Sequence, residues 1–353
     1  MNLATLGYNE FFGQQKTAQH LETFQMARVI IENKERYVVL SANGEFEAQI
    51  TGKLRFTANS KMDFPAVGDW VAITETDSNQ AIIHEIINRK SYLARKMVDS
   101  NDLQLIAANI DVAFITTSVD RDFNLNRIDR YLAIINTGKV QPAILLTKTD
   151  LANETDLKSH IELLEKQYTG ISIYSLSSLE NTGFEPFAKI LEKGKTYCFL
   201  GSSGVGKSTI INKLIGYNLQ ETNELSTTTN KGKHTTTRRE LIVKENYILI
   251  DTPGMREIGL TTDQEGIDTT FPEIMALAGQ CKFQNCTHTS EKGCAVIAAI
   301  KNNELNERTF ENYKKLERER TRLEASIEEK RKTDRQFGKM CKQIMSEKKK
   351  SKY

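Results

Sequence analysis

The sequence predicts a multidomain protein in which an all-β barrel, an α/β domain and a mainly helical domain follow one another. Three patterns indicate this order. Residues 24–96 contain short apolar runs, residues 97–262 alternate apolar strands with helical stretches, and residues 263–353 combine a Cys/His cluster with charged helical sequence. Residues 1–23 form an N-terminal extension. A chain of 353 residues has room for three domains.

The first region is expected to form five short strands. The pair Asn43-Gly44 predicts a type I′ hairpin turn. Ser91–Lys96 is expected to form a short basic connector after the last strand. Five strands in roughly 65 residues suit a small OB-like barrel, which binds single-stranded nucleic acid or structured RNA. A barrel used only for docking is the alternative. The expected strands are Gln25–Ile31, Arg36–Ser41, Glu45–Ile50, Trp70–Thr74 and Ala81–Ile86.

The second region alternates apolar runs with helical stretches such as Asn126–Thr137 and Asp156–Tyr168. Continuous apolar runs between turns are typical of buried parallel strands. The pattern therefore predicts a doubly wound α/β domain. The expected strands are Val112–Thr116, Ala143–Thr147, Ile171–Leu176, Tyr197–Leu200 and Tyr247–Ile250.

A glycine-rich segment follows the strand Tyr197–Leu200 and precedes a helical stretch, Thr209–Leu214. Its pattern, glycine, four residues and then Gly-Lys-Ser, is that of a phosphate-binding loop, in which backbone N–H groups approach the phosphates. Lys207 is expected to bridge the β- and γ-phosphates, and the Ser208 hydroxyl to ligate Mg²⁺. A glycine-rich turn without a ligand is the alternative. The expected contacts are Gly201, Ser202, Ser203, Gly204, Val205, Gly206, Lys207, Ser208 and Thr209.

The segment Thr147-Lys148-Thr149-Asp150 ends another apolar strand and is expected to bind guanine. The Asp150 carboxylate can accept from both N1–H and the exocyclic amine of guanine, which adenine does not offer. Lys148 would lie along the base plane, and Ser175 would contact the base from a nearby loop. Thr147 stands where such motifs usually have Asn, so a weaker tie to the phosphate loop is expected. A solvated Lys/Asp turn is the alternative.

Two further segments are expected to sense the γ-phosphate. Asp251, after the strand Tyr247–Ile250, would hold Mg²⁺ through water, and the N–H of Gly254 would reach the γ-phosphate. Upstream, Thr236 is our choice among three consecutive threonines as a Mg²⁺ ligand, and His234 is a candidate for positioning the attacking water. A polar loop without these roles is the alternative.

The motif order is unusual, because the guanine-reading segment precedes the phosphate loop. A parallel sheet can keep the same strands in space while the chain ends move. We therefore expect a circularly permuted GTP-binding domain whose Asp251 switch leads directly into the C-terminal domain. Ras-like enzymes place Gln after this switch motif to orient water, whereas this chain has Met255, so slow intrinsic hydrolysis is expected.

Three cysteines and one histidine lie within fourteen residues of the third region. This donor set is that of a closed tetrahedral zinc site, which staples a small domain rather than performing chemistry. The total of five cysteines is odd, which favours metal ligation over disulfides. A metal-free cluster is the alternative. The expected ligands are Cys281, Cys286, His288 and Cys294.

Charge is concentrated near the C-terminus, although the net charge is only +2. Lys330–Lys352 holds ten basic and two acidic residues, so RNA or another polyanion is the natural partner. A solubilising end is the alternative. No apolar run approaches the ~20 residues that span a bilayer, and no secretory signal is recognisable. We therefore expect a cytoplasmic protein with no membrane partner. We also expect a monomer.

These motifs, in this order, resemble the ribosome small-subunit-dependent GTPase A (RsgA) family. The resemblance runs from about residue 24 to about residue 320 and includes Pro65–Trp70 and Gly232–Thr237. It implies an OB barrel, a circularly permuted GTPase domain and a zinc domain. It also implies late maturation of the small ribosomal subunit, with rRNA contacts and GTP hydrolysis stimulated by the particle. The N-terminal extension and the long basic tail depart from the pattern, so a divergent paralogue with another particle is an alternative.

Two other functions fit part of the sequence. One is an RNA-binding assembly factor that uses GTP mainly as a conformational switch, with little turnover. The other is a phosphate-loop ATPase or kinase, against which the Lys148/Asp150 pair argues.

Overall fold

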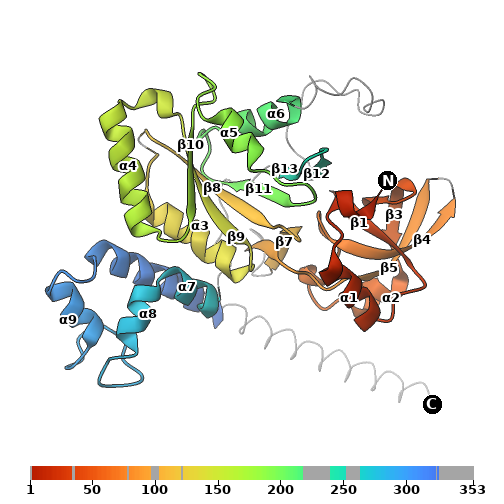
Figure 1. The fold of residues 1–353 in the computed structure, drawn as a ribbon. Coiled ribbons are helices and arrows are strands. Elements are labelled where there is room, and N and C mark those ends of the chain that lie inside the picture. Colours follow the sequence, from red (N-terminus) through yellow and green to blue (C-terminus); the bar gives the residue numbers. More distant parts are fainter. Residues whose placement is uncertain are drawn as a thin grey trace, which may run out of the picture.

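The computed structural model describes residues 2–33, 36–77, 79–96, 103–120, 122–217, 239–251, 263–322 and 324–325. These residues form a barrel, an α/β domain and a group of C-terminal helices, which confirms the fold class predicted from the sequence (Figure 1). No helix among them combines the length and the apolar character that crossing a membrane requires.

The barrel is closed and five-stranded. Its strands follow the order β1-β2-β3-β5-β4, and β4 returns to pair with β1. Only β3 and β5 are parallel, and helix α2 (Gly52–Thr57) connects β3 to β4. All five predicted strands are confirmed. They are β1 (Gln25–Asn33), β2 (Arg36–Ser41), β3 (Gly44–Ile50), β4 (Trp70–Asp77) and β5 (Gln80–Ile86).

The predicted type I′ turn at Asn43-Gly44 is wrong. Ser41 pairs with Gly44, so the loop consists of Ala42 and Asn43, and neither has the positive φ that a type I′ turn requires. The Ser41 hydroxyl accepts from the Asn43 N–H at 3.0 Å. A local side-chain turn of this kind competes with the Asn-Gly signal and shifts the loop by one residue.

The N-terminal extension folds onto the barrel rather than standing apart from it. A short 3₁₀ helix (Leu3–Leu6) and helix α1 (Glu10–Ala18) place Leu6 and Phe12 beside Trp70, which is fully buried. The ring of Tyr8 meets the Trp70 ring edge-on at a centroid distance of 4.9 Å. The extension thus completes a second apolar cluster on the outside of the barrel.

The segment that follows the barrel is a strand rather than an irregular connector. Strand β6 (Tyr92–Lys96) pairs with the antiparallel strand β7 (Leu103–Ala108). Gly138, at the end of helix α3, approaches this ribbon so closely that a Cβ there would lie 1.8 Å from the Tyr92 carbonyl oxygen. The ribbon is therefore packed directly against the α/β domain.

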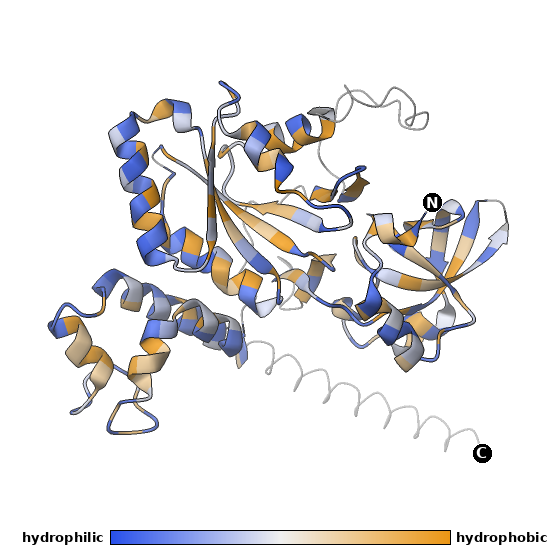
Figure 2. Ribbon diagram, viewed as in Figure 1, coloured by the Kyte–Doolittle hydropathy of each residue, from blue (hydrophilic) through white to orange (hydrophobic). Residues whose placement is uncertain are grey.

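The α/β domain is built on strands in the order β10-β9-β8-β11-β13-β12, all parallel except the short strand β12, which also pairs with β1 of the barrel. The five predicted strands are confirmed; β12 was not predicted. In Figure 2 the central strands are largely orange, whereas α4 mixes blue and orange. The strands are β8 (Val112–Ser118), β9 (Gln141–Thr147), β10 (Ser172–Leu176), β11 (Thr196–Leu200), β12 (Glu240–Val243) and β13 (Ile248–Asp251).

Helices cover both faces of this sheet. Ile128 and Leu164, from α3 and α4, share one apolar cluster with the strands, while Phe187 and Leu214, from α5 and α6, share another. This two-sided burial explains why the strands read as continuous apolar runs. The helices are α3 (Leu125–Thr137), α4 (Glu154–Gln167), α5 (Phe184–Lys189) and α6 (Lys207–Tyr217).

Among the C-terminal helices, α7 packs beside α3, and α8 packs against both α7 and α9 (Figure 1). The C-terminal helices are α7 (Gln264–Thr270), α8 (Pro272–Ala278), α9 (Ala295–Lys301) and a helix over residues 307–322. Gly266 of α7 lies so close to α3 that a Cβ there would be 2.7 Å from the Ala133 carbonyl oxygen. Leu305, Tyr313 and Leu316 are buried against these helices.

One buried arginine joins the extension, the barrel and the α/β domain. Arg28 of β1 donates to the carbonyls of Leu6, Gly68 and Asn109 and to the Thr196 hydroxyl, at 2.5–3.2 Å. Its side chain is 1% exposed. Because each acceptor comes from a different segment, this guanidinium fixes the barrel relative to strand β11.

Candidate functional site

The strands that carry the nucleotide motifs end at one edge of the sheet. β8, β9, β10, β11 and β13 are parallel neighbours, and Ser118 pairs with Thr147 while Cys198 pairs with Ile250. The carboxyl ends of parallel strands meet at a common edge, where ligands of open α/β sheets bind. The phosphate loop, the guanine segment and Asp251 therefore lie along one border.

The phosphate loop turns sharply between β11 and α6. At Gly201 the backbone has a φ of 152°, and a Cβ there would lie 2.3 Å from the Thr116 carbonyl oxygen, so only glycine fits. Val205 is buried and anchors the loop, whereas Ser203, Gly204, Ser208 and Thr209 are exposed. The loop thus presents backbone and hydroxyl groups to a ligand.

Lys207 lies over this loop. Its ammonium donates to the carbonyl oxygens of Gly201 at 2.7 Å and Ser202 at 2.5 Å. The charge is therefore held against the segment whose N–H groups would bind phosphate.

Thr147 ties the guanine segment to the phosphate loop. Its hydroxyl donates to the Val205 carbonyl at 2.6 Å, although the residue is only 1% exposed. Although this position lacks the usual Asn, the shorter threonine reaches the loop directly, and the expectation that the tie is weaker stays a prediction. The two motifs are hydrogen-bonded to each other.

We expect the substitution Thr147→Val to weaken GTP binding about 5- to 10-fold. Valine keeps the volume but leaves the buried Val205 carbonyl without this donor, at a cost of about 1–1.4 kcal/mol. Titration with a fluorescent GTP analogue measures the effect, with Thr155→Val on the exposed surface of α4 as the matched control. Equal affinities for the two variants would show that the tie is unimportant.

The Asp150 carboxylate, which is expected to bind the base, has a defined partner. The Ser177 hydroxyl donates to Asp150, and Ser177 is itself fully buried. Ser175, which the sequence suggested, lies within β10 and pairs with Leu146. Ser177 is therefore the serine of this loop that orients Asp150.

Lys148 is oriented by a residue that no motif indicated. Its backbone is left-handed, with a φ of 57°, and its ammonium lies 3.0 Å from the carboxylate of Asp120. That carboxylate also accepts from the Ser118 hydroxyl at 2.8 Å and the Asp122 N–H at 3.0 Å. The Asp122 N–H and the Lys148 ammonium lower the pKa of Asp120 to about 2, so it remains a fixed negative charge at neutral pH.

Arg127, at the start of α3, links the polar residues around Lys148 to the phosphate loop. Its guanidinium pairs with Asp122 and donates to the Ser202 hydroxyl at 2.5 Å. Tyr131, one helical turn later, is buried on the same side of α3. Sequence reasoning missed Arg127 and Asp120 because their partners lie 75 and 28 positions away in the chain.

The switch residues are only partly described. Asp251 ends β13 and pairs with Glu240 of β12. Thr236, His234, Gly254 and Met255 lie outside the described residues.

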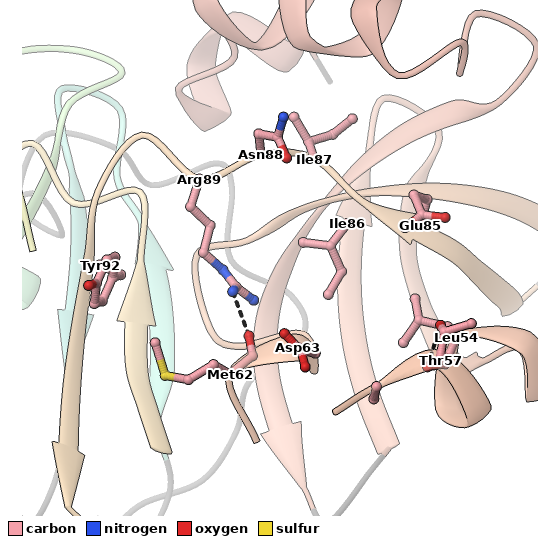
Figure 3. Close-up of a pocket in the computed structure, with 11 residues that line it drawn as sticks. Leu54, Thr57, Met62, Asp63, Glu85, Ile86, Ile87, Asn88, Arg89 and Tyr92 are labelled. Carbon is pink, nitrogen blue, oxygen red and sulfur yellow. Dashed lines mark hydrogen bonds between the residues drawn. The ribbon is translucent and has the colours of Figure 1, made fainter. Parts of the chain in front are cut away.

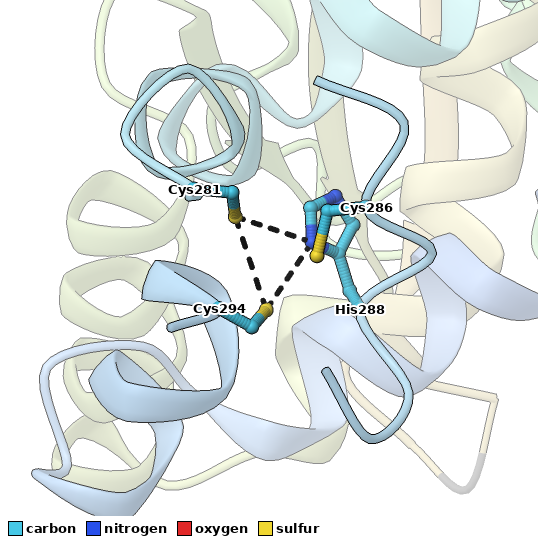
Figure 4. Close-up of side chains that lie close together, drawn as sticks. All are labelled: Cys281, Cys286, His288 and Cys294. Carbon is cyan, nitrogen blue, oxygen red and sulfur yellow. Dashed lines mark hydrogen bonds between the residues drawn. The ribbon is translucent and has the colours of Figure 1, made fainter. Parts of the chain in front are cut away.

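The four predicted metal ligands converge. Their donor atoms all lie within 4.8 Å of one another (Figure 4). The Cys281 and Cys294 sulfurs are 3.9 Å apart, and His288 Nδ1 lies 3.6 Å and 3.4 Å from them. A tetrahedral zinc ion has S···S edges of about 3.8 Å and S···N edges of about 3.5 Å for its usual bond lengths. The cluster therefore fits a metal ion in both donor set and spacing.

Glu291 shapes the loop that carries His288. Its carboxylate accepts from the N–H groups of Thr287 at 2.8 Å, Thr289 at 3.0 Å and Ser290 at 3.1 Å. Lys314, from the helix over residues 307–322, donates to the Thr287 carbonyl at 3.0 Å. These contacts hold the ligand loop against the last described helix.

A pocket of about 450 Å³ lies in the barrel, outside this nucleotide region (Figure 3). Arg89 forms one wall, but its guanidinium is already bound to the carbonyls of Met62 and Phe64 and to Asp69, at 2.7–2.9 Å. This arginine therefore supports the barrel rather than offering a free cation.

Comparison with known proteins agrees with the motif order. A family model described as RsgA GTPase matches residues 86–261, and one described as 50S ribosome-binding GTPase matches residues 196–330. The small ribosomal subunit biogenesis GTPase RsgA 2 of Lactiplantibacillus plantarum is 42% identical over 89% of both chains. This chain belongs to the RsgA GTPase family.

The similarity also extends to the chain ends and to solved structures. RsgA 2 of Vibrio parahaemolyticus is 39% identical and covers 99% of this chain and 94% of its own. The crystal structure of YjeQ from Thermotoga maritima matches with a TM-score of 0.63 and 25% identity, over 83% of this chain and 96% of its own. YloQ, a circularly permuted GTPase, matches with the same score and identity, over 86% and 97%.

Proposed function

We propose that this RsgA-family GTPase binds the small ribosomal subunit and assists its late maturation, with GTP hydrolysis stimulated by the particle. The observation that supports it most is the meeting of the phosphate loop, the Thr147–Asp150 segment and Asp251 at one sheet edge. The names of the relatives supply the particle, since they are small ribosomal subunit biogenesis GTPases.

Each motif receives a role in this proposal. Asp150, oriented by Ser177, accepts from guanine, and Lys148, oriented by Asp120, flanks the base. Loop N–H groups and Lys207 hold the β- and γ-phosphates. Ser208, Asp251 and Thr236 are the residues that would hold Mg²⁺, which when bound neutralises charge on the phosphates.

The reaction is the hydrolysis of GTP to GDP and phosphate. The oxygen of water bonds to the γ-phosphorus while the bond to the β–γ bridging oxygen breaks. His234 is proposed to position this water, and the Gly254 N–H to contact the γ-phosphate. The Met255 side chain has no amide group that could orient the water. The particle is therefore proposed to complete the arrangement around the γ-phosphate.

The C-terminal domain is proposed to hold one structural zinc ion through Cys281, Cys286, His288 and Cys294. Together with the barrel and the tail Lys330–Lys352, it would contact rRNA. The protein would act as a cytoplasmic monomer.

Phosphate release tests the proposal. Basal kcat should lie far below 1 s⁻¹, as in unstimulated Ras-like GTPases, and small subunits should raise it at least ~10-fold. The assay compares small subunits, large subunits and no particle; the large-subunit arm matters because one matching family is described as 50S-binding. Equal rates in all three would refute particle-stimulated hydrolysis.

Particle affinity provides a second test. Binding should weaken steeply as salt increases, since phosphate contacts release counterions. Deleting Lys330–Tyr353 should lower particle affinity more than GTP affinity. Particle binding without faster turnover would favour an assembly factor that uses GTP mainly as a switch.

A further inference from the structure

Helix α3 touches the phosphate loop with one face. The Arg127 guanidinium donates to the Ser202 hydroxyl at 2.5 Å. Tyr131 is buried four residues further along, and side chains four apart lie on the same side of a helix. This face of α3 therefore holds a hydroxyl of the loop.

Another face of α3 binds the helix over residues 307–322. The Asp129 carboxylate is 2% exposed and accepts from Arg308 at 2.9 Å and Asn312 at 2.9 Å. It also accepts from the Tyr168 hydroxyl at 2.8 Å. One residue further along α3, Arg130 pairs with Glu319 at 2.8 Å.

These contacts are costly to break. A buried carboxylate that loses its cationic partner is left uncompensated, which is strongly destabilising. α3 must therefore follow the C-terminal helix, or Asp129 loses the guanidinium that Arg308 supplies.

The two sets of contacts are close together along the helix axis. Arg127 and Asp129 differ by two residues, a rise of about 3 Å. Ile128 and Leu132, between and beyond them, are buried in the core at 1% and 3% exposure. A packed helix shifts as a unit, so displacement at Asp129 is felt at Arg127.

We propose that α3 couples the C-terminal helix to the phosphate loop, with Arg127 as the positioning residue that holds Ser202 for the triphosphate. Docking of residues 307–322 keeps α3 seated, and a seated α3 preorganises the loop. The inference rests on the proposed nucleotide site. Coupling of this kind is reciprocal, so GTP in turn stabilises the docked C-terminal helix.

A double-mutant cycle tests the coupling. In titrations with a fluorescent GTP analogue, Arg308→Gln should weaken binding about 5-fold, the lower end of common coupling strengths. Arg318→Gln, an exposed arginine of the same helix, is the matched control and should leave affinity unchanged. In a Ser202→Ala background, Arg308→Gln should have no further effect, because the loop contact is already lost. Additive effects of the two substitutions would overturn the proposal.

Hydrogen exchange gives a readout that does not depend on the Arg308 variant folding well. GTP should slow exchange of residues 307–322 in the parent but not in Ser202→Ala. Unchanged exchange in the parent at saturating GTP would also overturn the proposal. The outcome is separate from the proposed function: a parent that fails to bind GTP refutes the nucleotide site, whereas GTP binding with an additive cycle refutes only the coupling.

Discussion

Replacing Asp150 with Asn should weaken GTP binding by about 30-fold, on the order of 2 kcal/mol. The variant keeps an oxygen that can accept from Ser177, so the loop should remain in place. It loses the second acceptor that pairs with the two donors of guanine. Calorimetric titration of parent and variant with GTP measures the loss.

Xanthosine triphosphate is the matched control ligand. Xanthine carries a carbonyl where guanine has its exocyclic amine, so the Asn amide can donate where Asp must accept. Asp150→Asn should therefore bind xanthosine triphosphate more tightly than the parent does. If the variant binds GTP as tightly as the parent and still rejects ATP, the base site is misassigned.

Cys286→Ala should release the metal ion and loosen residues 270–322. Apparent zinc-binding free energies of about 10–16 kcal/mol are comparable to the stability of a whole domain, so the order of such a region depends on the ion. GTP should still bind, because no nucleotide motif lies in this cluster, but with the loss of affinity, about 5-fold, that is expected when the helix over residues 307–322 no longer holds α3 in place. Metal analysis of protein purified without chelator, with hydrogen exchange, measures both effects.

Cys198→Ala is the control for this experiment. Cys198 is fully buried in β11, and burial raises the pKa of its thiol, so it is a core residue rather than a ligand. This variant should keep one zinc ion per chain. Zinc retained by Cys286→Ala, or absent from the parent, would contradict a zinc site at the cluster.

Patterns of period and spacing were sufficient to predict most of the fold. Arg36–Ser41 was predicted with its observed bounds, because its four inner residues are apolar and are of the aromatic and branched types that favour strands. The phosphate loop was readable because Gly201 has no room for a side chain. The four metal ligands lie within fourteen residues, so the sequence alone was enough to group them.

The remaining features depend on contacts that no local pattern encodes. Asp120 and Arg127 act through partners far away in sequence, so nothing beside them marks their role. The hydrogen bond from the Thr147 hydroxyl to the Val205 carbonyl depends on the distance between two segments that only the folded chain brings together. Strand β12 has four residues, as β13 does, but no nucleotide motif follows it to mark its end.

The pairing of β12 with β1 has a consequence for dissecting this protein. Ile31 of the barrel pairs with Glu240, so the α/β sheet continues into the barrel strands as one eleven-stranded sheet. Arg239 adds an ion pair to Glu32 at 3.5 Å across the same junction. A fragment that keeps the α/β domain but lacks the barrel would therefore expose β12 as an unpaired strand edge. Exposed edges pair with strands from other molecules. Such a fragment should self-associate, whereas a polar or proline substitution within β12 should keep it dispersed.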